Sequence, residues 1–211
     1  MVDCNSQFIE MFGDPISNSK GWPVKTIKDV APEVKPALPK QEKYWLLNLD
    51  AIETFSGKVT GKTMVALDQM GTSVSSFDTS MVLYSKLRPY LNKVTVPDEY
   101  GYSTTELVGL CPDSKYLRRE FLFYILRSEE FVQYSNQISG GTQMPRMPMK
   151  ELRNFKCILP PLELQDEYKS FVQQSDKSKF VAQIASNLNL SRCIVSIQES
   201  SLRSFLRHMQ G

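Results

Sequence analysis

The sequence predicts an α/β domain, in which helices accompany a mixed twisted sheet, followed by a long helical arm that forms a coiled coil. Residues 22–112 alternate short β-forming runs with clusters of turn residues, residues 116–137 carry an amphipathic helical pattern, and residues 162–210 contain neither glycine nor proline. We therefore expect a short N-terminal helix over residues 1–15, the α/β domain over residues 16–160 and the long helix over residues 161–211.

The composition is that of a folded protein, and it argues against several classes. Of the 211 residues, 41% are hydrophobic and 23% are charged, and the formal net charge of +2 is too small to indicate a nucleic-acid partner by itself. Four cysteines stand at long intervals without a Cys-x-x-Cys pair, which argues against a zinc site and a disulfide framework. No apolar run approaches the about 20 residues of a membrane helix, and residues 1–10 lack a signal-peptide pattern. We expect a cytoplasmic protein with reduced thiols, no metal and no membrane contact.

Turn residues divide the first half of the chain into short elements. Phe8 and Phe12 belong to the apolar face of a short helix, which Gly13 followed by Pro15 ends. Runs rich in β-forming residues, separated by turn residues, indicate a mostly antiparallel or mixed sheet. The strands are expected at residues 44–49, 58–67, 80–85, 93–96 and 102–110.

A helical region follows these strands. Residues 116–137 place apolar side chains at helical spacing, and the glycine pair at 140–141 ends the pattern. Pro148 suits the first turn of a short helix, after which residues 156–159 form a last strand. The proline pair at 160–161 then marks the start of the long helix.

The last quarter of the chain has the pattern of a coiled coil. Steps of alternately three and four residues define a seam of nine positions, of which Ser191 and Gln198 are polar. A helix of this length could reach roughly 70 Å and cannot bury its own apolar stripe. We expect it to pair with another helix, and a long core helix of the same domain is the alternative. The residues expected to pair are Val181, Ile184, Leu188, Val195, Leu202 and Phe205.

The sequence shows no catalytic apparatus. Its single histidine, His208, lies in the last turn of the predicted helix, where we expect a solvated or dipole-facing role and not that of a general base. Gly61-Lys62-Thr63 is similar to the end of a phosphate-binding loop, but residue 56 is serine where such a loop needs glycine. A glycine-rich cofactor loop and the base-holding motif of amino-methyltransferases are also missing. We therefore expect a protein that is not an enzyme and binds no cofactor.

Positive charge is concentrated in two loop-rich segments, residues 56–95 and 138–156. Lysine and arginine neutralise phosphates, whereas Arg, Gln and Thr on loops can contact base edges in the major groove of DNA. Two other interpretations stay open: an ordinary solvated surface, and an Arg88 that pairs with an acid to hold its own loop. The candidate DNA contacts are Lys62, Thr72, Lys86, Arg88, Lys93, Thr104, Gln143 and Arg146.

Three motifs in a fixed order resemble a known family. They are Tyr84-Ser85-Lys86-Leu87-Arg88-Pro89-Tyr90, Gly140-Gly141-Thr142-Gln143 and Pro160-Pro161-Leu162-Glu163-Leu164-Gln165. With residues 8–15, they make nearly the whole chain similar to the specificity subunit of type I restriction-modification enzymes. That subunit usually carries two target-recognition domains and two conserved helices, whereas this chain has one of each. The resemblance therefore implies a half-subunit or a fragment.

The same resemblance implies a non-catalytic subunit that recognises one half of a bipartite site in double-stranded DNA and docks the modification (methyltransferase) subunit. Two copies joined through their helices would restore two recognition domains at a fixed separation. S-adenosylmethionine and the target adenine would belong to the modification subunit, and a restriction subunit is a further partner that the resemblance allows. Two alternatives stay open: the recognition domain of a single-chain nuclease-methyltransferase, and a helical scaffold protein without DNA recognition.

Overall fold

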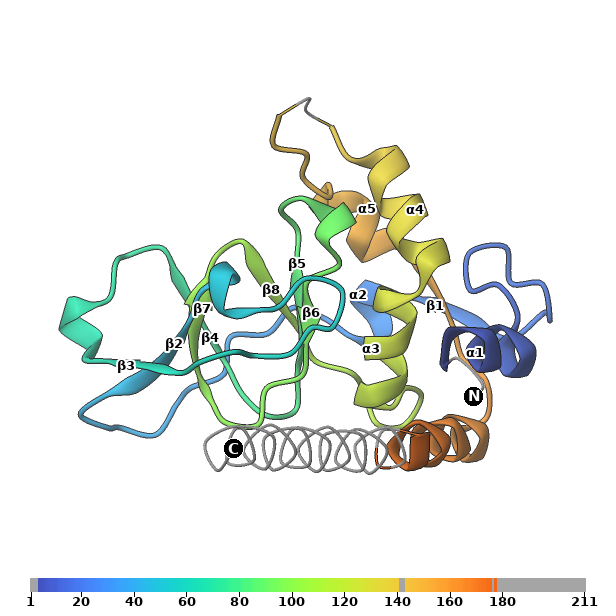
Figure 1. The fold of residues 1–211 in the computed structure, drawn as a ribbon, viewed down its shortest axis with the longest axis horizontal. Helices are drawn as coiled ribbons and strands as arrows, with labels where there is room; N and C mark the ends of the chain where they lie inside the picture. Colours follow the sequence, from blue (N-terminus) through green and yellow to red (C-terminus); the bar gives the residue numbers. More distant parts are fainter. Residues whose placement is uncertain (1–3, 141–142, 176, 178–211) are drawn as a thin grey trace, which may run out of the picture. The chain divides into compact units, whose positions relative to one another are not determined.

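The computed structural model describes residues 4–140, 143–175 and 177 (Figure 1). The chain divides into two compact units, residues 1–169 and residues 170–211. The first unit combines small sheets with helices, as the sequence predicts for an α/β domain. Its elements, in chain order, are α1 (Cys4–Phe12), β1 (Val24–Thr26), α2 (Ile27–Val30), β2 (Tyr44–Leu47), η1 (Leu49–Ala51), β3 (Thr63–Val65), η2 (Leu67–Gln69), β4 (Val74–Phe77), β5 (Val82–Ser85), η3 (Pro89–Leu91), β6 (Val94–Thr95), β7 (Gly101–Thr104), β8 (Leu107–Leu110), α3 (Arg119–Arg127), α4 (Glu129–Ile138), α5 (Met149–Asn154) and β9 (Lys156–Ile158).

The strands form three small sheets. A four-stranded sheet has the order β3-β2-β7-β4, in which β2 and β7 are parallel and the other two pairs are antiparallel. A three-stranded antiparallel sheet has the order β6-β5-β8, and β1 pairs with β9 in a two-stranded antiparallel ribbon. The mixed topology is as predicted, but the strands are divided among several sheets.

One cluster of buried side chains joins the two larger sheets. Trp45 and Phe77 of the four-stranded sheet meet edge to face, with ring centroids 5.3 Å apart. Leu83 and Leu107 of the three-stranded sheet complete the same cluster, and all four side chains are at most 2% exposed. Each such side chain stabilises the fold by about 1.5–3 kcal/mol on burial. The cluster therefore fixes the two sheets against each other.

The strand predicted over residues 102–110 is in fact two strands. Thr105 and Glu106 form a turn between β7 and β8, and the two strands belong to different sheets. In the sequence, this turn is hidden because β-forming residues continue on both sides of it. Two smaller differences are that only Thr63–Val65 of the run at 58–67 is a strand, and that β1 and β4 were not predicted.

The helix predicted over residues 116–137 is also divided, at Ser128. This residue has extended backbone angles, and its Oγ accepts a hydrogen bond from the Phe131 N–H at 3.2 Å, the geometry of a helix N-cap. The side-chain amide of Asn92 donates to the Arg127 carbonyl oxygen at 2.9 Å and so satisfies the end of α3. Two short helices, α3 and α4, therefore replace the single helix.

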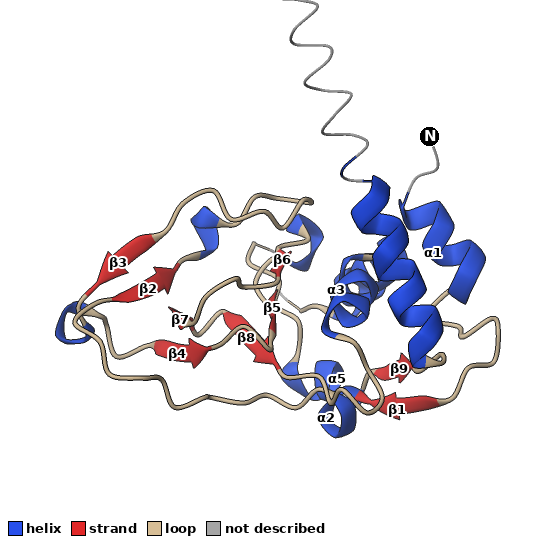
Figure 2. Cartoon of the chain, turned by 90° about the horizontal axis from the view of Figure 1, so that it is seen from below, coloured by secondary structure: helices blue, strands red, loops and turns tan. Residues whose placement is uncertain are grey.

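An aromatic cluster holds the N-terminal helix in the first unit. Phe8 of α1 lies 5.6 Å from Phe121 of α3 and 5.4 Å from Tyr168, measured between ring centroids. Tyr168 belongs to the helix that starts at residue 162, and its hydroxyl donates to the Cys4 carbonyl oxygen at 2.8 Å. Figure 2 shows α1, α3 and the start of this helix side by side. Gly13, with φ of +75°, ends α1 as predicted.

The helix that starts at residue 162 is described as far as residue 175. The predicted pairing residues, from Val181 to Phe205, lie outside the described residues, so the predicted coiled coil stays a prediction. Within the described part of the chain, no helix is both long enough and apolar enough to cross a membrane.

Candidate nucleic-acid interface

Three chain segments far apart in the sequence meet at the end of β5. The Lys86 N–H donates to the Glu106 carbonyl oxygen at 3.0 Å, and the Lys86 carbonyl oxygen accepts from the Met147 N–H at 2.8 Å. Next to it, the Arg88 N–H donates to the Pro145 carbonyl oxygen at 2.8 Å. In Figure 1 the chain after β5 and the loop between α4 and α5 extend on the same side of the molecule. Backbone hydrogen bonds thus assemble one surface from loops, which we call the recognition face: residues 72–73, 86–88, 104–106 and 143–147.

The turn between β7 and β8 extends this face towards Thr72. The Thr105 N–H donates to the Ser73 carbonyl oxygen at 3.3 Å, and Thr72 beside it is exposed. Thr104 is placed differently, because its Oγ1 is buried and has no hydrogen-bond partner among the described residues. Thr72 and Thr105 are therefore better placed than Thr104 to contact a ligand.

Arg88 is an exposed cation on a strained backbone. Its φ of 50° and ψ of 66° lie in the left-handed region, and it directly precedes Pro89 at the start of η3. A non-glycine residue in this region costs roughly 1–2 kcal/mol. Within the described residues the Arg88 side chain makes no ion pair, so the alternative that it holds its loop through an acid finds no support there.

Arg146 lies beside Arg88 but is held by an acid. Its Nη2 lies 3.3 Å from Glu106 Oε1 and its Nε lies 3.4 Å from Glu106 Oε2, both long for charged hydrogen bonds. The Arg146 side chain is 50% exposed and that of Glu106 is 28% exposed. The exposed residue Gln143 stands in the same loop. Because exposed ion pairs are weak, Glu106 can orient Arg146 without preventing it from binding an outside partner.

Glu106 was not among the sequence candidates, and Lys62 and Lys93 are not in the recognition face. Glu106 was missed because it stands within a run that the sequence presents as one strand. Lys62 Nζ pairs with Asp98 at 2.8 Å and Glu99 at 2.7 Å, and these hydrogen bonds raise the pKa of Lys62. Lys93, the residue before β6, donates from its Nζ to the carbonyl oxygen of Leu49 in η1 at 2.6 Å. Both ammonium groups therefore already have hydrogen-bond partners within the protein.

The recognition face presents cationic and polar side chains. Its cations Lys86, Arg88 and Arg146 can contact phosphates, and Arg146, Gln143 and Thr72 have the donors and acceptors that base edges require. In the part of the chain that the structure describes, no group of His, Cys, Asp and Glu side chains could hold a metal ion. Cys111 and Cys157 are free thiols, and burial raises the pKa of the Cys157 thiol to about 12.

Comparisons with known proteins give a consistent relationship. Sequence models of protein families find no match in the chain. The specificity subunit of the type I restriction enzyme EcoDI from Escherichia coli is 27% identical over 160 residues, which are 75% of this chain and 35% of that protein. The chain therefore spans about a third of the length of this curated relative.

Solved structures show the same fold. The HsdS subunit from Thermoanaerobacter tengcongensis matches with a TM-score of 0.62 and 18% identity, over 79% of this chain and 45% of that one. A chain from a structure on the assembly and conformational transition of a type I restriction-modification system matches with a TM-score of 0.60 and 19% identity, over 78% of this chain and 44% of that one.

The curated relative is a specificity subunit, which agrees with the prediction that this chain is not an enzyme. The sequence similarity covers 75% of the chain, and the similarity in fold covers 78–79% of it. In sequence and in fold, the chain is thus similar to specificity subunits of type I restriction-modification enzymes, the family that its three motifs resemble.

Proposed function

We propose that this chain recognises one half of a bipartite sequence in double-stranded DNA as the specificity subunit of a type I restriction-modification system. It docks the methyltransferase subunit and acts as a dimer of half-subunits joined through the C-terminal helices. The observation that carries the proposal is the recognition face, where backbone hydrogen bonds bring Lys86, Arg88 and Arg146 together from two distant segments.

The chemistry of the face supports contact with DNA. Arg88 and Lys86 suit the phosphate backbone, because their charge has no ion-pair partner among the described residues. Arg146 suits a guanine edge, since a guanidinium can donate two hydrogen bonds to it at once. Glu106 prevents the face from being uniformly basic, and this favours discrimination between bases over binding to any DNA.

The partners in this proposal come from the relatives. One structural relative comes from a structure on the assembly of a type I restriction-modification system. S-adenosylmethionine and the modified adenine then belong to the methyltransferase subunit. Two copies of the chain, related by a two-fold axis, would present two recognition faces to a palindromic bipartite site.

The test is to map methylated adenines across the genome of cells that carry the chain together with its candidate methyltransferase subunit. We expect a bipartite methylated motif that disappears from cells lacking the chain. A palindromic motif supports the dimer of half-subunits, and an asymmetric motif means pairing with a different recognition domain. An unchanged methylation pattern contradicts the proposal and favours the scaffold alternative.

A further inference from the structure

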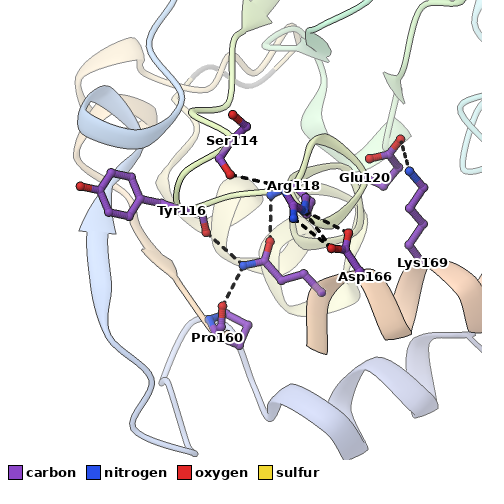
Figure 3. A network of polar contacts seen from close by, with 8 residues as sticks. Ser114, Tyr116, Arg118, Glu120, Pro160, Asp166 and Lys169 are labelled. Carbon is purple, nitrogen blue, oxygen red and sulfur yellow. Dashed lines mark hydrogen bonds and ion pairs between the residues drawn. The ribbon is translucent and has the colours of Figure 1, made fainter. Parts of the chain in front are cut away.

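The start of the long helix is fastened to the domain by one buried amide. Gln165 is 1% exposed, and its Oε1 accepts a hydrogen bond from the Arg118 N–H at 2.8 Å. Its Nε2 donates to the carbonyl oxygens of Pro160 at 2.8 Å and Tyr116 at 3.0 Å. Figure 3 shows Tyr116, Arg118 and Pro160, the residues whose backbone groups bond this amide. The side chain of Gln165, in the first turn of the helix, thus makes hydrogen bonds to three backbone groups.

Ion pairs extend the attachment along the helix. Asp166 accepts hydrogen bonds from Nε and Nη2 of Arg118, at 3.0–3.1 Å, and Lys169 Nζ lies 3.2 Å from Glu120 Oε1 (Figure 3). The first two turns are therefore held at Gln165, Asp166 and Lys169. We call these contacts the helix junction.

The junction is directional in a way that apolar packing is not. A buried amide that loses its partners is costly, and replacing a polar network by well-packed apolar groups is often neutral or stabilising. What Gln165 adds is geometry, since one acceptor and two donors are satisfied only in one orientation of the helix. Glutamate cannot donate both bonds and methionine can make none of them.

In a long helix such as the sequence predicts, the orientation of the first turns has a large effect further along the axis. A tilt of about 10° displaces a point about 35 Å away, near the middle of the predicted helix, by about 6 Å. Successive base pairs are about 3.4 Å apart along DNA, so this displacement corresponds to nearly two base pairs. A loose junction would let a recognition domain reach half-sites at several separations.

We propose that Gln165 is a positioning residue that sets the number of base pairs between the two half-sites, by fixing the orientation of residues 162–169, the first two turns of the helix, on the domain. The inference rests on the proposed function, because it concerns two recognition domains joined through their helices. Asp166 and Lys169 support the same orientation from the solvent side of the junction.

The experiment repeats the methylation mapping with Gln165→Met, which keeps the length of the side chain and removes its three hydrogen bonds. The parent chain should give one spacer length. The variant should keep the same half-site bases but methylate sites whose spacer is one base pair longer or shorter, so that the preference for the parental spacer falls about tenfold or more. Asp166→Asn should cause the same broadening to a smaller extent, and it decides the question if Gln165→Met fails to fold.

Ile52→Val is the matched control, because Ile52 is 1% exposed in the sheet core and this change destabilises without touching the junction. It should leave the spacer unchanged. A single parental spacer in both junction variants, at lowered thermal stability, overturns the inference and leaves Gln165 a structural residue. If cells that carry the parent chain show no methylated motif that depends on it, the result overturns the proposed function instead.

Discussion

The recognition face and the helix junction lie in the same unit but are built by opposite means. In the face, backbone groups make the connecting hydrogen bonds, and side chains such as Arg88 and Gln143 are exposed. In the junction, the connecting hydrogen bonds are made by the side chain of Gln165, which is almost fully buried. Side chains in the face can therefore change without altering the loops that carry them, whereas the junction depends on the identity of one residue.

Under the proposed function, this difference would let the protein change its target and keep its architecture. A new base preference needs new side chains on a constant backbone, and the face provides that arrangement. Under the proposal, the spacing between two recognition domains needs a constant geometry, which the junction would provide. The predictions below separate the two regions, from the largest expected effect to the smallest.

The largest effect is expected on stability at the junction. Gln165→Met leaves the Arg118 N–H and two carbonyl oxygens without partners, and each buried unsatisfied group costs about 1–3 kcal/mol. We expect the free energy of unfolding to fall by about 3 kcal/mol, measured by urea denaturation of the purified chain. Arg146→Met in the recognition face should change it by less than about 0.5 kcal/mol. Equal losses in the two variants would show that the regions are not built differently.

The next effect is expected on DNA affinity at the face. Arg146→Met should weaken binding to DNA that contains the motif found by methylation mapping, by about 1–3 kcal/mol. It should weaken binding to unrelated DNA much less, because Arg146 is proposed to contact a base. Arg88→Ala should weaken binding to all sequences and lower the salt slope by about 1, as expected for one lost phosphate contact. Fluorescence anisotropy titrations at several salt concentrations measure both.

Lys62→Ala is the control for these titrations. Its ammonium group is paired with Asp98 and Glu99, so its removal should leave the salt slope nearly unchanged. A decrease as large as that of Arg88→Ala would place Lys62 in the DNA contact after all. That result would extend the face beyond the segments that the backbone hydrogen bonds connect.

A smaller effect separates the charge of Arg88 from its backbone conformation. Arg88→Gly and Arg88→Ala remove the same charge, but only glycine adopts the left-handed conformation without strain. Both variants should bind DNA equally weakly, whereas Arg88→Gly should be more stable than Arg88→Ala by about 1 kcal/mol. Thermal unfolding of the two proteins compares them directly. A glycine variant that is the less stable of the two would mean that the loop is not strained at this residue.

The sequence predicted most of the elements, and it failed where a turn or a cap stood inside a continuous pattern. The end of α1 at Gly13 and the short helix after Pro148 were predictable, because glycine and proline act locally. The turn at Thr105 and Glu106 was not, since β-forming residues surround it. The break at Ser128 was not predicted either, because the amphipathic pattern continues through it.

The candidate site was predictable in part for a similar reason. Local charge and loop composition indicated Lys86, Arg88 and Arg146, which the fold brings together. The same signals cannot show that Lys62 has acidic partners 36 and 37 residues away, at Asp98 and Glu99. The role of Gln165 was equally hidden, because its partners Arg118 and Tyr116 are backbone groups 47 and 49 residues away.

The smallest effect is expected from pH, and it again belongs to the junction. Burial raises the pKa of Glu120, but hydrogen bonds from its own backbone N–H, Lys169 and Arg119 outweigh burial, so the pKa lies below the usual 4.5. A carboxyl whose pKa is lower in the folded state stabilises the protein above its unfolded-state pKa, and this contribution is lost as the pH falls through the folded-state value. The parent chain should therefore lose more stability between pH 6 and pH 3 than Glu120→Gln, measured as the urea midpoint.

Asp98→Asn is the matched comparison for this pH effect. Hydrogen bonding to Lys62 also lowers the pKa of Asp98, but the Asp98 side chain is 72% exposed whereas that of Glu120 is 26% exposed. Solvent screens the exposed pair, so Asp98→Asn should change the pH dependence less than Glu120→Gln does. Because Lys169 belongs to the helix, only Glu120→Gln should also broaden the spacer preference near neutral pH. An identical pH dependence in the two variants would show that the junction carboxylate contributes no more than a surface one.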